Sequence, residues 1–221
     1  MSTSASARDR ILGRLKAAAP QVALPVPVLP AVTAVPLAGE ALAEQLKTFV
    51  AALQAAHAEV VDARGGSVVA LLENFCKTKN IRRLLVPTGN FGTIALPGVK
   101  VEAFDRPVED FKNALFTEID AGLTIADCGL ADTGVLVQRS TPRQPRTLSL
   151  VPPIHFCLIN INRLYADMRS ALSGEGWVAD MPSNLIFISG PSKTADIQQT
   201  LAYGAHGPKE LIVFLVAEDV L

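Results

Sequence analysis

The sequence predicts an α/β fold in which a mostly parallel sheet carries helices on both faces. Hydrophobic residues make up 49% of the 221 residues but aromatic residues only 5%, which indicates a core of Val, Leu, Ile and Ala. Short aliphatic runs bounded by turns, such as 185–189 and 211–216, are typical of strands buried on both faces. Segments with helical spacing of apolar residues separate many of these runs, which favours strand–helix–strand units.

Residues 1–36 are predicted to form a separate N-terminal part, and residues 37–221 the domain itself. Residues 6–19 have helical spacing, with basic side chains around an apolar side of Ile11, Leu12 and Leu15. Prolines interrupt the stretch up to residue 36. Because proline fixes φ and lacks an N–H donor, this stretch is predicted to be an extended connector.

Within the domain, apolar residues at helical spacing predict helices at 38–58, 68–79, 108–116, 164–173 and 194–203. Ser67 is expected to cap the start of the helix 68–79. Aliphatic runs that end at Pro, Gly or Asp predict strands at 60–61, 81–86, 99–104, 123–127, 133–138, 148–151, 154–161, 185–189 and 211–216. The runs between 123 and 151 follow one another without a helix, so a hairpin or short antiparallel piece is expected there.

Composition excludes several classes of function. Lys and Arg number 20 against 21 acidic residues, so the balanced charge disfavours nucleic acid and membrane partners. The longest apolar run, 211–217, is far shorter than the ~20 residues of a spanning helix. Residues 1–14 are polar and basic and lack the apolar core of a signal peptide. We therefore expect a cytoplasmic protein.

The spacing of the cysteines and the pattern of the glycines do not match a known cofactor-binding motif, so no cofactor is predicted. The three cysteines are far apart in the sequence, so they are expected to be buried, reduced thiols: Cys76, Cys128 and Cys157. Neither a Rossmann glycine fingerprint nor a flavin motif is present, so no redox cofactor is expected.

The first candidate site is the loop Ser189-Gly190-Pro191-Ser192-Lys193-Thr194, between a predicted strand and a predicted helix. Free N–H groups at a helix start attract anions, and a bound phosphate or carboxylate would offset the unfavourable position of Lys193 in the first turn. Alternatively, Ser192 only caps the helix while Asp196 offsets Lys193. The local residues leave both interpretations open.

Two further segments carry polar groups. Asp132 and Thr133, followed by Gly134, could supply a general base and an orienting donor, although Asp-Thr-Gly is also a common turn. The loop 139–146 holds three arginines that can bind carboxylates through two hydrogen bonds each. Solvated charge explains Arg143 more readily than Arg146, which abuts a predicted strand.

The three histidines allow a structural or a chemical interpretation. His57 lies near a helix C-terminus and is expected to be structural. His155 opens a strand, where a buried, hydrogen-bonded histidine is expected, and His206 can simply cap a helix. Alternatively, His155 and His206 converge beside Asp132 as a proton-transfer or metal site. The spacing of the histidines does not favour metal, so none is predicted.

Four segments together resemble one family. They follow one another in the order typical of the LUD domain of lactate-utilisation protein C: Gly129-Leu130-Ala131-Asp132-Thr133-Gly134-Val135-Leu136, Leu150-Val151-Pro152-Pro153-Ile154-His155, Ser189-Gly190-Pro191-Ser192-Lys193-Thr194-Ala195-Asp196-Ile197 and Gly204-Ala205-His206-Gly207-Pro208-Lys209. The likeness runs from about residue 40 to 216. One departure is Val135, where the family often has a second threonine.

The resemblance implies a fold like that of ribose-5-phosphate isomerase, the CoA transferases and 5-formyltetrahydrofolate cyclo-ligase. It also implies a role with two iron–sulfur partner proteins in oxidising L-lactate to pyruvate. Because those partners carry the cluster cysteines, this chain is expected to be the cluster-free component.

Ligands of open α/β sheets bind beyond the carboxyl ends of strands. We therefore expect the Asp132 turn, the Gly190 loop and the His206 loop to gather around one hollow that holds a small anionic metabolite. Asp132 and His206 would be the catalytic groups, and the ligand-binding residues would be Thr133, Gly134, Arg146, His155, Gly190, Ser192, Lys193, Thr194 and Gly207. Two alternatives are a stand-alone isomerase or acyl/CoA transferase-like enzyme and a non-catalytic structural or regulatory partner, between which fold does not choose.

Overall fold

The computed structural model describes residues 6–18, 37–195, 201–203 and 207–217. The chain divides into two units, residues 1–31 and 32–221. In the first unit, the predicted helix is present as α1 (Ala7–Ala18), and none of its residues is buried. Its apolar side chains are therefore exposed, namely Ile11, Leu12 and Leu15. Among the described helices of both units, none has the length and apolarity needed to cross a membrane.

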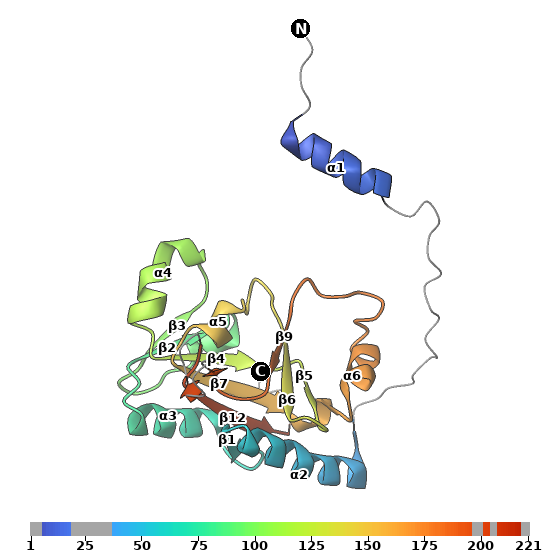
Figure 1. Ribbon diagram of the computed structural model, residues 1–221. Helices are drawn as coiled ribbons and strands as arrows, with labels where there is room; N and C mark the ends of the chain where they lie inside the picture. Colours follow the sequence, from blue (N-terminus) through green and yellow to red (C-terminus); the bar gives the residue numbers. More distant parts are fainter. Residues whose placement is uncertain (1–5, 19–36, 196–200, 204–206, 218–221) are drawn as a thin grey trace. The chain divides into compact units, whose positions relative to one another are not determined.

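The second unit is built on a six-stranded sheet (Figure 1). In chain order its strands are β1 (Glu59–Asp62), β2 (Arg83–Val86), β3 (Lys100–Ala103), β4 (Ala121–Ile125), β7 (Ile154–Asn160) and β12 (Glu210–Val216). The spatial order is β1-β12-β7-β4-β2-β3, and every neighbouring pair is parallel. This arrangement confirms the predicted α/β class with a mostly parallel sheet.

Helices cover both faces of this sheet, as predicted. On one face, α3 (Val68–Thr78) packs Leu72 into a cluster with Phe156 and Phe214. Its N-terminus is capped as expected, because the Ser67 side chain accepts a hydrogen bond from the Ala70 N–H at 3.3 Å. On the other face, α2 (Gly39–Ala55) contributes Phe49 and Leu53, and α4 (Val108–Thr117) contributes Phe111 and Leu115.

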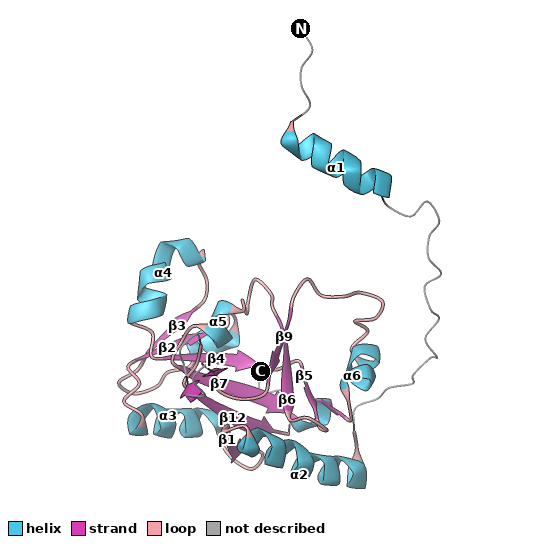
Figure 2. Cartoon of the chain, in the orientation of Figure 1, coloured by secondary structure: helices cyan, strands magenta, loops and turns pink. Residues whose placement is uncertain are grey.

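A second, four-stranded sheet lies beside the first. Its strands are β5 (Cys128–Leu130), β6 (Val135–Arg139), β8 (Leu164–Tyr165) and β9 (Leu185–Ile188), in the spatial order β8-β5-β6-β9. Strands β5 and β6 form an antiparallel hairpin, where a hairpin was expected. Helix α6 (Met168–Gly174) packs beside this sheet (Figure 2), and starts after the predicted residue 164 because residues 164–165 belong to β8. The unit also contains two short 3-10 turns, η1 (Asn90–Thr93) and η2 (Ile161–Arg163).

Two predicted elements are wrong. The predicted strand 148–151 is part of a short helix, α5 (Thr147–Leu150), which lies between Pro145 and Pro152 and packs on β4. The described ends of the predicted helix 194–203 are strands, β10 (Lys193–Ala195) and β11 (Leu201–Tyr203), which pair antiparallel with Lys193 opposite Tyr203, and residues 196–200 lie outside the described part of the chain. A short apolar run fits either period, so pairing with distant residues decides the outcome.

Candidate functional site

The carboxyl ends of β2 and β4 form a point where the chain diverges. These two strands are neighbours, but the chain leaves β2 for the adjacent strand β3 and leaves β4 for the second sheet. In open α/β sheets a crevice opens where connections of adjacent strands run in different directions, and ligands bind there. This edge is therefore the first place to look for a site.

A cleft of about 400 Å³ opens at this point, and we call it the β2–β4 cleft. Its walls come from three segments, which follow β2, follow β4 and follow β6. The lining residues are Pro87, Thr88, Gly89, Phe91, Ile125, Ala126, Asp127, Arg139, Thr141, Arg143 and Gln144.

Backbone contacts fix the walls of the β2–β4 cleft relative to one another. Gly89 has φ 119° and ψ −147°, a conformation that essentially only glycine adopts, so the chain can turn directly after β2. The backbone N–H of Thr88 donates to the Arg143 carbonyl at 3.0 Å. The Gln144 side chain accepts from the Ile125 N–H and donates to the Ile125 carbonyl, both at 2.8 Å. The loop 139–146, which we call the arginine loop, is therefore tied to both strand ends.

The charges of this cleft are only partly neutralised. Arg139 is bound to Asp127, with 2.9 Å between its Nε and Oδ1 of the carboxylate. Arg143 is exposed and has no carboxylate partner within the described part of the chain. The Thr88 hydroxyl likewise has no hydrogen-bond partner among the described residues. The β2–β4 cleft thus offers one uncommitted guanidinium group and one uncommitted hydroxyl to an anion.

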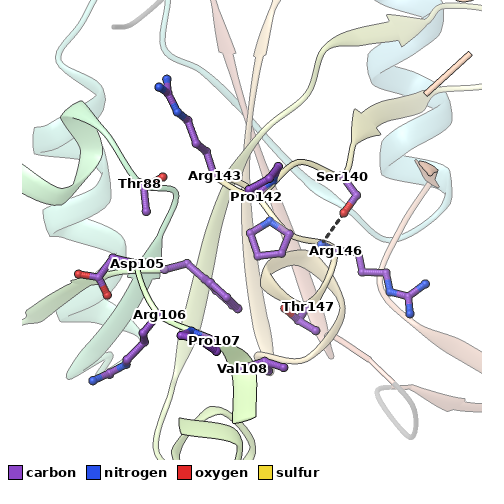
Figure 3. Close-up of a pocket in the computed structure, with 12 residues that line it drawn as sticks. Thr88, Asp105, Arg106, Pro107, Val108, Ser140, Pro142, Arg143, Arg146 and Thr147 are labelled. Atoms are coloured by element: carbon purple, nitrogen blue, oxygen red, sulfur yellow. Dashed lines mark hydrogen bonds between the residues drawn. The ribbon is translucent and has the colours of Figure 1, made fainter. Parts of the chain in front are cut away.

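A second, larger cleft of about 730 Å³ adjoins the first at the end of β3, and we call it the β3 cleft (Figure 3). The two clefts share Thr88 and Arg143. The other residues of the β3 cleft come from the β3–α4 connection and from the arginine loop: Phe104, Asp105, Arg106, Pro107, Val108, Ser140, Pro142, Pro145, Arg146 and Thr147. Of the predicted ligand-binding residues, Arg146 is the one that lies here.

The predicted Asp132 turn lies away from both clefts, against helix α2. Gly134 has φ +64°, and a Cβ there would meet the Ala52 Cβ at 2.6 Å, so this position requires glycine. Asp132 and Thr133 are exposed, and the Thr133 hydroxyl donates to the Asp132 carboxylate at 2.9 Å. The turn fits the simpler interpretation, in which the aspartate bonds locally.

The predicted Gly190 loop lies at the opposite edge of the six-stranded sheet. The Ser192 N–H donates to the Pro208 carbonyl at 2.8 Å, and Gly207 lies directly beside Ser192. Residues 207–209 precede β12, so this loop is at the amino ends of the strands. Lys193 is exposed and begins β10, which also contains Thr194, so the described residues directly after the loop form a strand.

His155 is buried inside the sheet rather than open to a ligand. Its Nε2 and the Thr124 Oγ1 are 2.8 Å apart, and the side chain is 1% exposed. Burial lowers the pKa of His155 to about 3, because the charged imidazolium loses its water. His155 is therefore neutral at physiological pH. His206 lies outside the described residues.

The expected common hollow does not form in the described structure. Arg146 is at the carboxyl edge of the sheet, the Ser192 and Lys193 loop is at the amino edge, and the Asp132 turn is on the second sheet. Gly134 lies against Ala52 and Gly190 lies against Ala56, at successive turns of the same helical stretch. The Asp132 turn and the Ser192 loop both follow strands of the second sheet, but they do not share an edge with Arg146.

The matches to known proteins agree with the fold. The family model of the LUD domain matches residues 46–216. The chain belongs to the LUD domain family.

Two curated relatives cover most of this LUD-domain chain. An uncharacterised protein of Neisseria meningitidis serogroup B is 42% identical over 183 residues, which cover 80% of this chain and 78% of the relative. Lactate utilization protein C of an Exiguobacterium species is 28% identical over 188 residues and 81% of each chain. A solved structure, that of a DUF162 family protein from Deinococcus radiodurans, matches with a TM-score of 0.60 at 22% identity, over 82% of this chain and 99% of its own. That likeness shows the fold.

The cysteines of this LUD domain lie in three different core clusters. Cys76 is on the buried side of α3, Cys128 is in the second sheet, and Cys157 is in the cluster under α2. Burial raises the pKa of the Cys128 and Cys157 thiols to about 12, because the thiolate is disfavoured away from water. Within the described residues, no three His, Cys, Asp or Glu side chains are grouped as metal ligands.

Sequence reasoning missed the principal residues of the clefts in this LUD domain, Thr88 and Arg143. The signal was present: Pro87-Thr88-Gly89 directly follows a buried strand, which is where a ligand-binding turn of an α/β sheet is found. Arg143 could not be distinguished from solvated charge, because the backbone contact that places it beside Thr88 joins residues 55 positions apart.

Proposed function

We propose that this chain acts in lactate utilisation as a cluster-free component that binds a small anionic metabolite in the β2–β4 cleft. The link to lactate rests on the LUD domain and on relatives named lactate utilization protein C, including the Exiguobacterium protein and a 37% identical match over 106 residues from Shouchella clausii. The binding site rests on the geometry of the cleft.

The observation that carries the proposal is Arg143. A guanidinium group binds a carboxylate or phosphate through two parallel hydrogen bonds. Arg143 stands at the carboxyl ends of β2 and β4 without a carboxylate partner among the described residues, and the neighbouring Arg139 is already held by Asp127. A small carboxylate bound by Arg143 would also reach the Thr88 hydroxyl. The apolar walls of Phe91 and Ile125 leave room for a short aliphatic group.

The Gly190 loop is less suited to anions than sequence reasoning suggested. Residues 193–195 form a strand, so the loop does not lead directly into the anion-attracting N–H groups of a helix start. The small cavity beside the loop, of about 270 Å³, is lined by Lys209 but also by Glu59 and Glu210. Both carboxylates share one lysine, since Lys79 lies 2.6 Å from Glu210 and 3.8 Å from Glu59, so this cavity has little net positive charge for an anion.

Calorimetric titration of the full chain with lactate, pyruvate and inorganic phosphate tests the proposal. Because a charge-assisted hydrogen bond contributes about 1.5–3 kcal/mol, Arg143→Ala should weaken binding of the preferred anion by roughly 10- to 100-fold. Lys193→Ala is the matched control and should bind like the wild type. If Lys193→Ala abolishes binding while Arg143→Ala does not, the site is at the Gly190 loop and the proposal is wrong.

We further propose that the chain works with iron–sulfur proteins of the lactate-utilisation system. Its own cysteines are buried in separate clusters, so they are poorly placed to share one iron–sulfur cluster. Affinity purification of the tagged chain from cells grown on lactate should recover such partners after a wash at high salt. Recovery of the chain without them, at native expression levels, would contradict this part of the proposal.

A further inference from the structure

The β3 cleft combines apolar walls with a cationic rim, and the proposed anion site does not use it. The apolar part of its wall consists of three proline rings and one valine side chain, namely Pro107, Pro142, Pro145 and Val108. Figure 3 shows Arg106, Arg143 and Arg146 extending from its rim in different directions. Such a mixture is typical of sites that take an organic ligand with both a flat apolar part and negative charge.

The three arginines at the rim differ in how far other side chains already bind them. Arg106 lies 3.4 Å from Glu102 and stacks over the Phe111 ring at 4.9 Å, so it is partly engaged. Arg143 and Arg146 have no carboxylate partner in the described part of the chain. Against them stands one carboxylate of the cleft, Asp105. The rim therefore carries an excess of positive charge that internal ion pairs do not remove.

Thr147, at the floor of this cleft, has an unsatisfied hydroxyl. Its Oγ1 is buried and has no hydrogen-bond partner among the residues that the structure describes. A buried polar group without a partner is costly, and such groups call for an explanation in native proteins. Rotation about the Cα–Cβ bond can move the hydroxyl to the position of the methyl group, and a ligand oxygen in the cleft would give this hydroxyl a partner.

We propose that the β3 cleft binds a phosphate ester with a flat apolar body, a nucleoside phosphate, as a second ligand beside the small anion. The ring would lie against the prolines, and the phosphates would be bound by Arg146 at the rim, beside Arg143. The Thr147 hydroxyl would hydrogen-bond to the ligand. The cleft volume of about 730 Å³ is within the range of small-molecule sites. Because Arg143 lines both clefts, the two ligands would lie next to each other.

Titration of the full chain with ADP, adenosine and inorganic phosphate tests this second site. ADP should bind at least about tenfold more tightly than either fragment, because only ADP uses both the apolar walls and the rim. Adenosine binding as tightly as ADP would exclude a role for the arginines, and phosphate binding as tightly would exclude a role for the walls. Absence of ADP binding at about 1 mM, the weak end of small-molecule affinity, would overturn the proposal.

Two variants test whether the ligand lies in the β3 cleft. Arg146→Ala should weaken ADP binding by about tenfold without changing the affinity for lactate or pyruvate, since Arg146 lines only the β3 cleft. Thr147→Val keeps the shape of the side chain, so it should weaken ADP binding several-fold and raise the melting temperature of the unliganded protein. Arg82→Ala, at the other end of β2, is the matched control and should bind ADP normally. Unchanged ADP binding in both cleft variants would overturn the proposal.

Discussion

Asp127 accepts two hydrogen bonds from Arg139, one from the side-chain Nε at 2.9 Å and one from the backbone N–H at 2.6 Å. The pair joins the end of β4 to the end of β6, and the arginine loop begins there. One consequence is structural, because the loop starts from a fixed point. The other is chemical, because the charge of Arg139 is neutralised and Arg143 is left as the uncommitted cation of the β2–β4 cleft.

Replacing Asp127 should therefore affect stability and binding together. Asp127→Ala removes both hydrogen bonds, and we expect the free energy of unfolding to fall by about 1–2 kcal/mol, an amount reduced by the partial exposure of Arg139. Affinity for the small anion should fall because the loop that carries Arg143 loses its anchor. Urea unfolding and calorimetric titration measure the two effects. In a double-mutant cycle, the effects of Asp127→Ala and Arg139→Ala on the free energy of unfolding should not be additive. Strictly additive effects would show that the Asp127–Arg139 pair does not hold the loop in place.

Gly134 should tolerate no side chain. Alanine at this position combines a left-handed φ of +64° with a clash against Ala52, so Gly134→Ala should cost roughly 3 kcal/mol. Gly176→Ala is the matched control: its φ is +72°, but no atom lies within 4 Å of the added Cβ, so it should cost about 1 kcal/mol. Thermal or urea unfolding compares them. Equal losses would show that the contact of the Asp132 turn with α2 contributes nothing.

His155 should make the protein less stable in mild acid. Its pKa is about 3 in the folded chain and 6.5 when exposed, so the unfolded chain binds one more proton between these values. The stabilising effect of keeping the imidazole neutral is complete above pH 6.5 and declines as the pH falls, by about 1.4 kcal/mol per pH unit. At pH 5 the loss should reach about 2 kcal/mol.

The comparison of wild type with His155→Gln isolates this effect. Glutamine does not titrate, so urea unfolding of the variant should lose the part of the pH dependence that lies between pH 6.5 and 5. The variant should start from a lower stability at pH 7, because it must replace the hydrogen bond to Thr124. A wild-type slope that persists in the variant would show that other groups cause it.

The regular part of the fold could be predicted because its signals are local. The periodicity around Leu72 and the capping by Ser67 belong to one short segment, and the aliphatic strand 210–216 can be recognised without knowing its partners. The strand order could not be read from the sequence, since β12 inserts between β1 and β7 through contacts of residues far apart in the chain.

The errors in the candidate site have the same cause. Lys193 was placed at a helix start by local pattern, but pairing with Tyr203 makes it part of a strand. The sequence indicates that the loops near Asp132 and Ser192 lie at strand ends, but only the three-dimensional arrangement shows which edge of the sheet each end faces. Thr88 and Arg143 line the same cleft because one backbone hydrogen bond of 3.0 Å joins two distant loops.

The most direct test of the account is a crystal structure of the full chain soaked separately with lactate, pyruvate and phosphate. We predict density for the bound anion between the Arg143 guanidinium and the Thr88 hydroxyl, beyond the ends of β2 and β4. Density against Ser192 and Lys193 at the amino edge of the sheet, with the β2–β4 cleft empty, would contradict it.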